Sequence, residues 1–168
     1  SGGTLSGVFA KGQTVTCQVT PSDGCATGAM KSADVAITNS APSVTGVDIV
    51  VASGSGPVTQ DSDVTCVPLN YFDLDGDESE STVLWSVNDV VVGNDTVLSA
   101  AFFGKDDTVK CTLTPFDGEA VGTPVSTSLL VGNTPPVASN AAITPNPAYT
   151  DSVLSCTADT EDADGELV

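Results

Sequence analysis

Two short acidic loops, DLDGDE at 73–78 and DADGE at 162–166, carry residue types that bind hard metal ions. In each loop three carboxylates stand at alternate positions around a glycine, with no basic residue between them. Clustered carboxylates repel one another, and Ca²⁺ relieves that repulsion because it takes six to eight oxygen ligands. The spacing therefore predicts calcium sites whose ligands are Asp73, Asp75, Asp77, Asp162, Asp164 and Glu166.

An EF-hand does not fit the first loop. Its glycine is the fourth loop residue rather than the sixth, and the twelfth position is Leu84 instead of glutamate. Asp23 and Asp117, in two P-x-D-G turns, would add ligands if they lie at the same end of the fold as the acidic loops. The alternative interpretation is a solvated turn rich in turn-forming residues, with no ion. An exposed loop offers no cleft for paired catalytic carboxylates, so we do not expect an enzyme.

The charge of the chain excludes several classes of partner. The 168 residues include 22 Asp and Glu against 4 Lys and Arg, giving a formal net charge of −18. Such a chain is repelled by phosphate backbones and anionic lipid, so we expect neither nucleic-acid nor membrane binding. The absence of histidine excludes Ser-His-Asp and Cys-His catalysis and histidine-ligated metals.

The elements that must position the loops are β-strands. Valine and threonine suit pleated, half-buried surfaces, and frequent Gly and Pro residues separate the runs. No stretch approaches the length of an apolar membrane span. Alternation of apolar and polar residues between turns predicts seven strands, near 46–52, 62–69, 82–87, 89–93, 96–102, 107–114 and 124–131. We therefore predict an all-β fold with a tight hairpin at Asn88-Asp89.

An internal repeat organises the chain. FAKGQTVTCQVTPSDG at 9–24 matches FGKDDTVKCTLTPFDG at 103–118, an offset of 94. DSDVTC at 61–66 matches DSVLSC at 151–156, an offset of 90. The repeat predicts one complete domain at 42–133, preceded by the second half of a domain at 1–41 and followed by the first half of another at 134–168.

The five cysteines are widely spaced, and none forms a CxxC pair, which excludes zinc-ribbon and thioredoxin-like sites. Single cysteines on strand-like runs indicate disulfides and an oxidising, extracellular compartment. An odd count leaves at least one cysteine needing a partner outside the chain. Cys25 has no counterpart in the repeat.

Cys66, Trp85 and Cys111, on the second, third and sixth predicted strands of 42–133, resemble the Cys…Trp…Cys pattern of the immunoglobulin-like (Ig-like) sandwich. DLDGDE, LWSVND and TVLSAAFFGKDDTVKCTLTPFDG resemble the tandem Ig-like, PKD-like and cadherin-like repeats of very large microbial surface proteins. The resemblance implies a Cys66–Cys111 disulfide with Trp85 packed on it. It also implies that Cys17 and Cys156 pair with neighbouring half-domains, supplied by flanking polypeptide or by another copy of the chain.

The function that this resemblance implies is structural. We expect a segment of an extracellular filament, fibre or surface stalk built of tandem disulfide-linked domains, with roles in reach, stiffness and cell adhesion. Its partners would be neighbouring copies or flanking domains. The alternatives are a binding module that recognises a glycan or receptor, and an accessory domain of a secreted enzyme.

Overall fold

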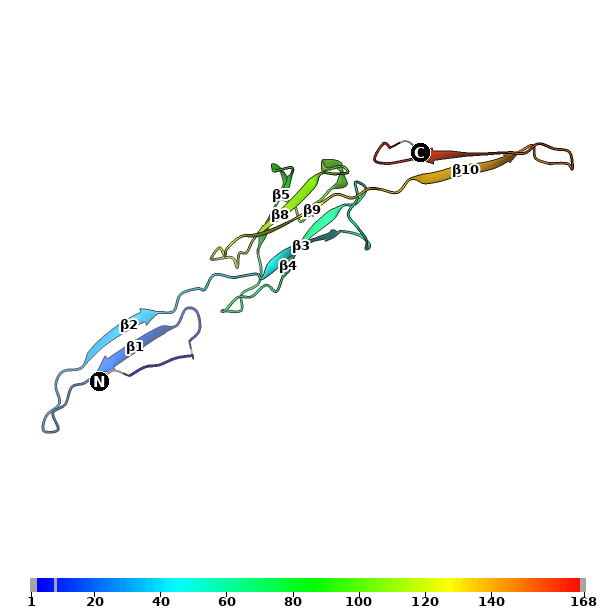
Figure 1. Cartoon of the computed structure of the whole chain (residues 1–168). Coiled ribbons are helices and arrows are strands. Elements are labelled where there is room, and N and C mark those ends of the chain that lie inside the picture. Colours follow the sequence, from blue (N-terminus) through cyan, green and yellow to red (C-terminus); the bar gives the residue numbers. More distant parts are fainter. Residues whose placement is uncertain (1–2, 8, 167–168) are drawn as a thin grey trace. The chain divides into compact units, whose positions relative to one another are not determined.

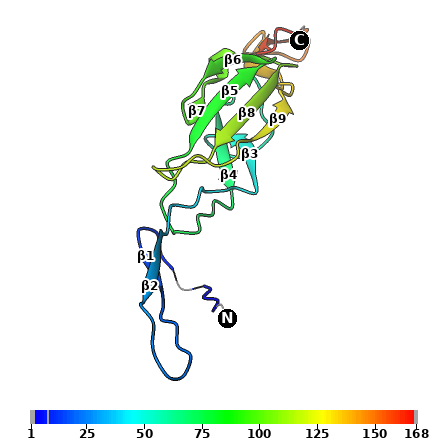
Figure 2. The ribbon, with the colours of Figure 1, turned by 90° about the vertical axis from the view of Figure 1, so that its left-hand side faces the viewer.

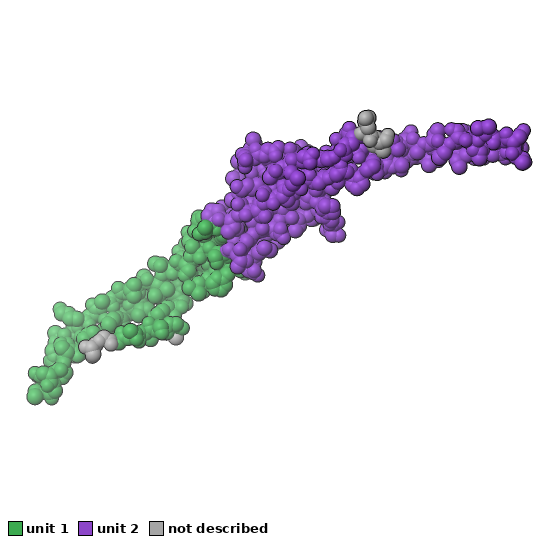
Figure 3. Space-filling model, in the orientation of Figure 1, with its two compact units in different colours: residues 1–43, 71–81, 115–123 green, residues 44–70, 82–114, 124–168 purple. Residues whose placement is uncertain are grey.

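The computed structural model describes residues 3–7 and 9–166, and these residues form two compact units (Figure 3). Unit 1 joins residues 1–43 to the loops at 71–81 and 115–123, and unit 2 contains the remaining residues. The predicted segments 1–41 and 134–168 end in residues 1–2 and 167–168, which lie outside the described residues. The predicted domain boundaries stay a prediction.

Unit 1 contains a single β-hairpin followed by loops. Strands β1 (Thr14–Val19) and β2 (Lys31–Ala36) pair antiparallel, with Cys17 opposite Ala33. The loop at 71–81 is joined to this segment by a backbone bridge between Ser43 and Phe72. The loop at 115–123 is joined to it by the hydrogen bond from Asn39 Nδ2 to Asp117 Oδ2. Gly122 is required here, because a Cβ atom at this position would collide with the carbonyl oxygen of Pro42.

Unit 2 contains two sheets that share one core (Figures 1 and 2). Figure 2 shows the four strands of the larger sheet in the order β6-β5-β8-β9, and the smaller sheet has the order β3-β4-β7. All pairings are antiparallel. The strands of the two sheets are β3 (Gly46–Val51), β4 (Val64–Leu69), β5 (Thr82–Val87), β6 (Val90–Gly93), β7 (Val97–Leu98), β8 (Thr108–Thr114) and β9 (Val125–Leu130).

The core is built by the alternating residues of these strands. In β8 the residues at every second position are buried, while their neighbours stay partly accessible, as expected for a strand with one face inside. Trp85 of β5 is fully buried and stands opposite Cys111 of β8 in the sheet register. Both sheets contribute to the same buried cluster, whose members are Val47, Ile49, Val64, Cys66, Trp85, Val87, Leu98, Phe103, Val109, Cys111, Leu113 and Val131.

The predicted strands agree with the structure, with one correction. The tight hairpin at Asn88-Asp89 is confirmed: both residues have positive φ, as a two-residue turn between β5 and β6 requires. The predicted strand at 96–102 is too long, because only Val97–Leu98 pairs with β4. The Ser99 hydroxyl accepts from the Ala101 amide and caps a short 3-10 helix, Ala100–Phe102, which ends the strand.

The chain continues in unit 2 as a second hairpin, formed by β10 (Val137–Thr144) and β11 (Ser155–Glu161). Its register repeats that of β3 and β4: Ile143 stands opposite Cys156 as Ile49 stands opposite Cys66. The all-β class is confirmed, since the described residues contain strands and one 3-10 helix but no α-helix. None of the described segments forms a helix that could cross a membrane.

Candidate metal centres

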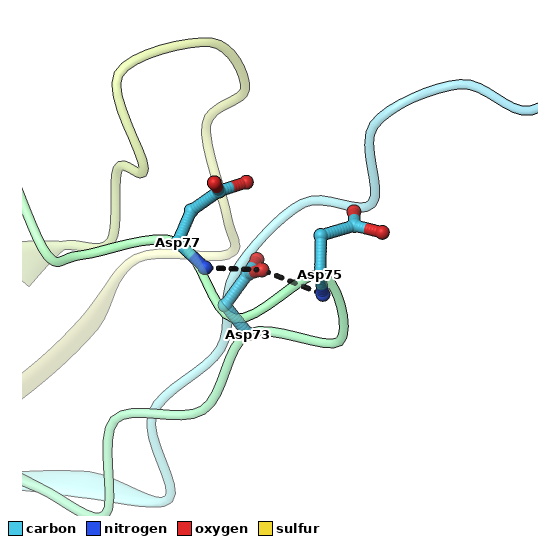
Figure 4. Close-up of side chains that lie close together, drawn as sticks. All are labelled: Asp73, Asp75 and Asp77. Carbon is cyan, nitrogen blue, oxygen red and sulfur yellow. Dashed lines mark hydrogen bonds between the residues drawn. The ribbon is translucent and has the colours of Figure 1, made fainter. Parts of the chain in front are cut away.

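The loop after β4 is held in shape by its first aspartate. Asp73 Oδ1 accepts hydrogen bonds from the amides of Asp75 at 2.8 Å and Asp77 at 3.2 Å (Figure 4). A short acidic side chain favours this local turn because it replaces a backbone acceptor. Gly76, with φ of 83°, allows the chain to reverse between the two donors. The turn therefore brings three carboxylates together that sequence spacing alone would leave on one side of an extended strand.

The three carboxylates of this loop converge on one place. One oxygen from each of Asp73, Asp75 and Asp77 lies within 4.8 Å of the others. Asp73 Oδ2 is buried and accepts no hydrogen bond from any described residue. A buried oxygen with negative charge and no partner is costly, and a cation would supply what it lacks. This loop could hold a metal ion.

A lysine from the first hairpin segment reaches the same loop. Lys11 Nζ lies 2.5 Å from Asp77 Oδ2 and 3.2 Å from Glu119 Oε2, and it donates to Asn39 Oδ1 at 3.0 Å. The hydrogen bond to Asp77 and, after it, the contact with Glu119 raise the pKa of Lys11 above its ordinary value. One ammonium cannot neutralise the carboxylates gathered here, which belong to Asp73, Asp75, Asp77, Asp117 and Glu119.

Backbone and amide groups of the segment that follows β2 complete the contacts. The Ser40 amide donates to Asp75 Oδ2 at 2.6 Å, and Asn39 Nδ2 donates to Asp117 Oδ2 at 2.8 Å. Asn39 therefore bridges Lys11 and Asp117, since its two side-chain polar atoms contact one of them each. These bonds position the acidic loop against residues 11–40 within unit 1.

The loop after β11 repeats this arrangement within unit 2. Asp162 Oδ1 accepts from the Asp164 amide at 2.9 Å, and Gly165 has φ of 79°. One ligand oxygen from each of Asp162, Asp164 and Glu166 lies within 4.8 Å of the others. Asp164 Oδ1 is buried without a hydrogen-bond partner among the described residues, as Asp73 Oδ2 is in the first loop. The second loop could also hold a metal ion.

The second loop is contacted by residues equivalent to those that contact the first loop, at the repeat offset of 94. The amide of Thr134, the equivalent of Ser40, donates a hydrogen bond to Asp164 Oδ2 at 2.6 Å. Lys105, the equivalent of Lys11, forms an ion pair with Glu166. This hydrogen bond to Glu166 raises the pKa of Lys105. Both loops are thus held by the same pair of groups, a backbone amide and a lysine.

Sequence reasoning missed these amide and lysine contacts. The signal was present in the repeat, because two of the four basic residues in the chain, Lys11 and Lys105, occupy equivalent positions. Asn39 and Asn133 also recur at the same offset. A lysine that recurs at the repeat offset in an acidic chain indicates a fixed ion pair. The spacing of carboxylates within each loop gives no information about contacts from residues outside the loop.

The aspartates of the two P-x-D-G turns, Asp23 and Asp117, accept hydrogen bonds from backbone amides of their own turns. Asp23 Oδ1 accepts from the amides of Cys25 and Ala26, both at 2.9 Å. Asp117 Oδ1 accepts from Glu119 and Ala120 in the same way, and its second oxygen accepts from Asn39. Asp117 therefore lies beside the first loop as a structural anchor, and neither aspartate belongs to the ligand cluster.

Asp117 makes unit 1 sensitive to acid. The Ala120 amide and the Asn39 side chain lower the pKa of Asp117 from 3.8 to about 2. A carboxyl group with a lower pKa in the folded state stabilises the fold above pH 3.8, and this contribution is lost as the pH falls toward 2. We expect Asp117→Asn to reduce the loss of stability between pH 5 and pH 2.5, measured by urea unfolding at each pH. The control is Asp34→Asn, an exposed position on β2, which should leave the loss unchanged; equal losses in all three proteins would contradict the assignment.

The cysteines fall into two groups. Cys66 of β4 and Cys111 of β8 form a disulfide that links the two sheets of unit 2, with a Cα–Cα distance of 6.2 Å. Cys17, Cys25 and Cys156 are exposed free thiols. A buried disulfide between strands is typical of proteins from oxidising compartments.

Comparison with protein-family models, with curated proteins and with solved structures gives no match to this chain. The candidate function therefore rests on the geometry and on the internal repeat.

Proposed function

We propose that this chain is a structural segment of an extracellular filament, fibre or surface stalk, built of tandem Ig-like β-sandwich domains. The observation that supports the proposal is a set of contacts that occurs twice, which we call the joint. In each joint an acidic loop is contacted by a backbone amide and a lysine from the preceding half of the repeat. The two joints lie about 90 residues apart in the sequence. A repeated joint suits an array that must be long and stiff, because each repeat then contacts the next one through the same groups.

Two features of the central segment support an Ig-like sandwich. A strand-to-strand disulfide joins the sheets β3-β4-β7 and β6-β5-β8-β9, and Trp85 on β5 is buried in the same core. This is the arrangement of cysteines and tryptophan that the Ig-like resemblance implies. The role is mechanical rather than enzymatic, since the disulfide and the repeated joint both resist extension.

Calcium is the ion that we assign to the two acidic loops. The donors are carboxylate oxygens from two turns, and one oxygen in each cluster is buried and unpartnered. Hard oxygen donors suit Ca²⁺ or Mg²⁺, and the irregular spacing of a turn suits Ca²⁺, because Mg²⁺ demands near-ideal octahedral geometry. A bound ion would also offset the negative charge that Lys11 and Lys105 leave uncompensated.

The test is thermal unfolding of the full chain in excess EDTA and in 5 mM Ca²⁺. Extracellular calcium modules have dissociation constants near 10⁻⁴ M, so binding should add about 2 kcal/mol per site to the free energy of unfolding. The midpoint should rise by roughly 4–8 °C. Asp73→Asn should abolish the rise in unit 1 and Asp164→Asn the rise in unit 2, while Asp34→Asn, outside both clusters, should keep both. Identical melting in EDTA and Ca²⁺ would remove calcium from the proposal.

A further inference from the structure

Four buried polar side-chain atoms have no hydrogen-bond partner among the described residues, and all four belong to residues of the two acidic loops or in contact with them. They are Asp73 Oδ2 and the Tyr71 hydroxyl at the first loop, and Asp164 Oδ1 and the Thr134 hydroxyl at the second. Each loop thus combines one charged acceptor with one hydroxyl. Buried polar groups are normally hydrogen-bonded, because their desolvation is otherwise uncompensated. The same pair of atoms at both loops indicates that the same kind of ligand completes them.

Both hydroxyls belong to residues that adjoin the carboxylates. Tyr71 precedes Asp73 by two residues, and the pKa of Tyr71 is raised by burial and, after it, by the charges of Asp73 and Asp117. The Thr134 amide donates to Asp164 Oδ2 at 2.6 Å, which brings the Thr134 side chain to the same carboxylate. The two hydroxyls come from different places in the repeat. The two loops therefore share the chemistry of the site rather than one sequence position.

Each carboxylate of the two clusters has one oxygen bound by the protein and one oxygen that accepts no hydrogen bond from a described residue. The bound oxygens of the first loop are Asp73 Oδ1, Asp75 Oδ2 and Asp77 Oδ2. Those of the second loop are Asp162 Oδ1, Asp164 Oδ2 and Glu166 Oε1. The donors are backbone amides and, at the last carboxylate of each loop, a lysine. Each loop thus offers about three oxygens to an ion, whereas Ca²⁺ takes about six to eight.

We infer that each loop binds a partly hydrated Ca²⁺ ion, and that its buried hydroxyl anchors one of the waters on the ion. The hydroxyl is that of Tyr71 in the first loop and that of Thr134 in the second. This inference rests on the proposed function and adds the water shell and its anchor to the calcium assignment.

The chemistry of the donors gives the hydroxyl this outer position. In proteins Ca²⁺ is bound by carboxylate oxygens, carbonyl oxygens and water, so a neutral hydroxyl suits contact with a bound water better than contact with the ion. The ion polarises its water, which becomes a stronger donor, and the hydroxyl oxygen accepts the resulting hydrogen bond. The ion and its water then satisfy both unpartnered atoms of each loop at once, and Lys11 and Lys105 keep their ion pairs.

The first test is a calorimetric Ca²⁺ titration of the full chain with one site removed at a time, by Asp164→Asn or by Asp73→Asn. Tyr71→Phe should weaken binding at the first loop about tenfold, and Thr134→Val should do the same at the second, as is typical when an outer hydrogen bond is lost. Thr134→Ser keeps the hydroxyl and should restore the affinity. Tyr149→Phe removes an exposed hydroxyl far along the chain and should change neither affinity. Melting in EDTA checks that each variant keeps its fold.

The second test counts the waters on the ion from the luminescence decay of bound Tb³⁺ in H₂O and in D₂O. We expect about three or more waters at each site, and the same number in Tyr71→Phe and Thr134→Val. A gain of about one water in these variants would make the hydroxyl a direct ligand and overturn the anchor, as would a site without bound water. Unchanged Ca²⁺ affinity in a variant overturns the anchor in its loop, while the calcium assignment stands. No Ca²⁺ binding by the unaltered chain removes both.

Discussion

Replacing both Cys66 and Cys111 by alanine is expected to lower the free energy of unfolding of unit 2 by about 4 kcal/mol. The disulfide closes a sequence separation of 45 residues, and in the chain-entropy model this loop restricts the unfolded chain by that amount. The loss is large compared with the stability of a small domain, which is typically about 5–15 kcal/mol. The double variant is preferred, because a single replacement would leave a thiol free to pair with Cys17, Cys25 or Cys156.

Urea unfolding followed by tryptophan fluorescence measures this loss directly, since Trp85 is the one tryptophan of the chain and lies beside the disulfide. Reduction of the unaltered protein should reproduce most of the effect. Cys25→Ala is the matched control, because Cys25 is exposed and unbonded, and its replacement should leave the midpoint unchanged. A loss below about 1 kcal/mol in the double variant would mean that the bond constrains the unfolded chain far less than the model requires.

Trp85→Ala is expected to cost about 3–5 kcal/mol, comparable to the loss of the disulfide. Trp85 has no exposed surface, and its ring nitrogen donates to the Asp95 carbonyl at 2.9 Å. Alanine would leave a cavity between the two sheets and an unpartnered carbonyl at its edge. Circular dichroism during urea unfolding measures the loss without the tryptophan signal.

Leu84→Ala provides the control on the same strand. Leu84 is the neighbour of Trp85 on β5, points to the other side of the sheet and is 45% exposed. We expect a much smaller loss there, within about 1 kcal/mol. Trp85→Phe should fall between the two, because it keeps most of the ring volume and removes only the donor to Asp95. Equal losses at positions 84 and 85 would contradict the assignment of Trp85 as the centre of the core.

The positions of the strands could be predicted from the local sequence pattern, but the residues at which some strands end could not. Alternation along TVKCTLT identifies β8 because one face of this strand is buried, and period two is visible in the residues themselves. The segment 96–102, TVLSAAF, is also rich in small and apolar residues, but β7 ends after Leu98. The Ser99 cap and the hydrogen bond from the Ala100 amide to Asp63 Oδ1 divert the chain there. Asp63 is distant in sequence, so no local pattern contains this information.

The acidic clusters themselves were predictable, and the groups that surround them were not. Alternate carboxylates around a glycine identify Asp73, Asp75 and Asp77 because all three lie within five residues and one turn gathers them. Lys11 is 66 residues from Asp77 and 108 residues from Glu119. The repeat marks Lys11 and Lys105 as equivalent residues, yet only the folded chain shows that each of them contacts an acidic loop.

The sequence by itself determined the all-β class, the 94- and 90-residue offsets, the strands that carry cysteine and the two acidic loops, because each of these depends on neighbouring residues. The structure contains the Cys66–Cys111 bond that the sequence resemblance implied, and it shows Cys17, Cys25 and Cys156 as free thiols. It also decided that Asp117 anchors its own turn instead of joining the ligands, and that an amide and a lysine hold each loop. These features join segments far apart in the chain, and their energies arise only when packing brings such segments together.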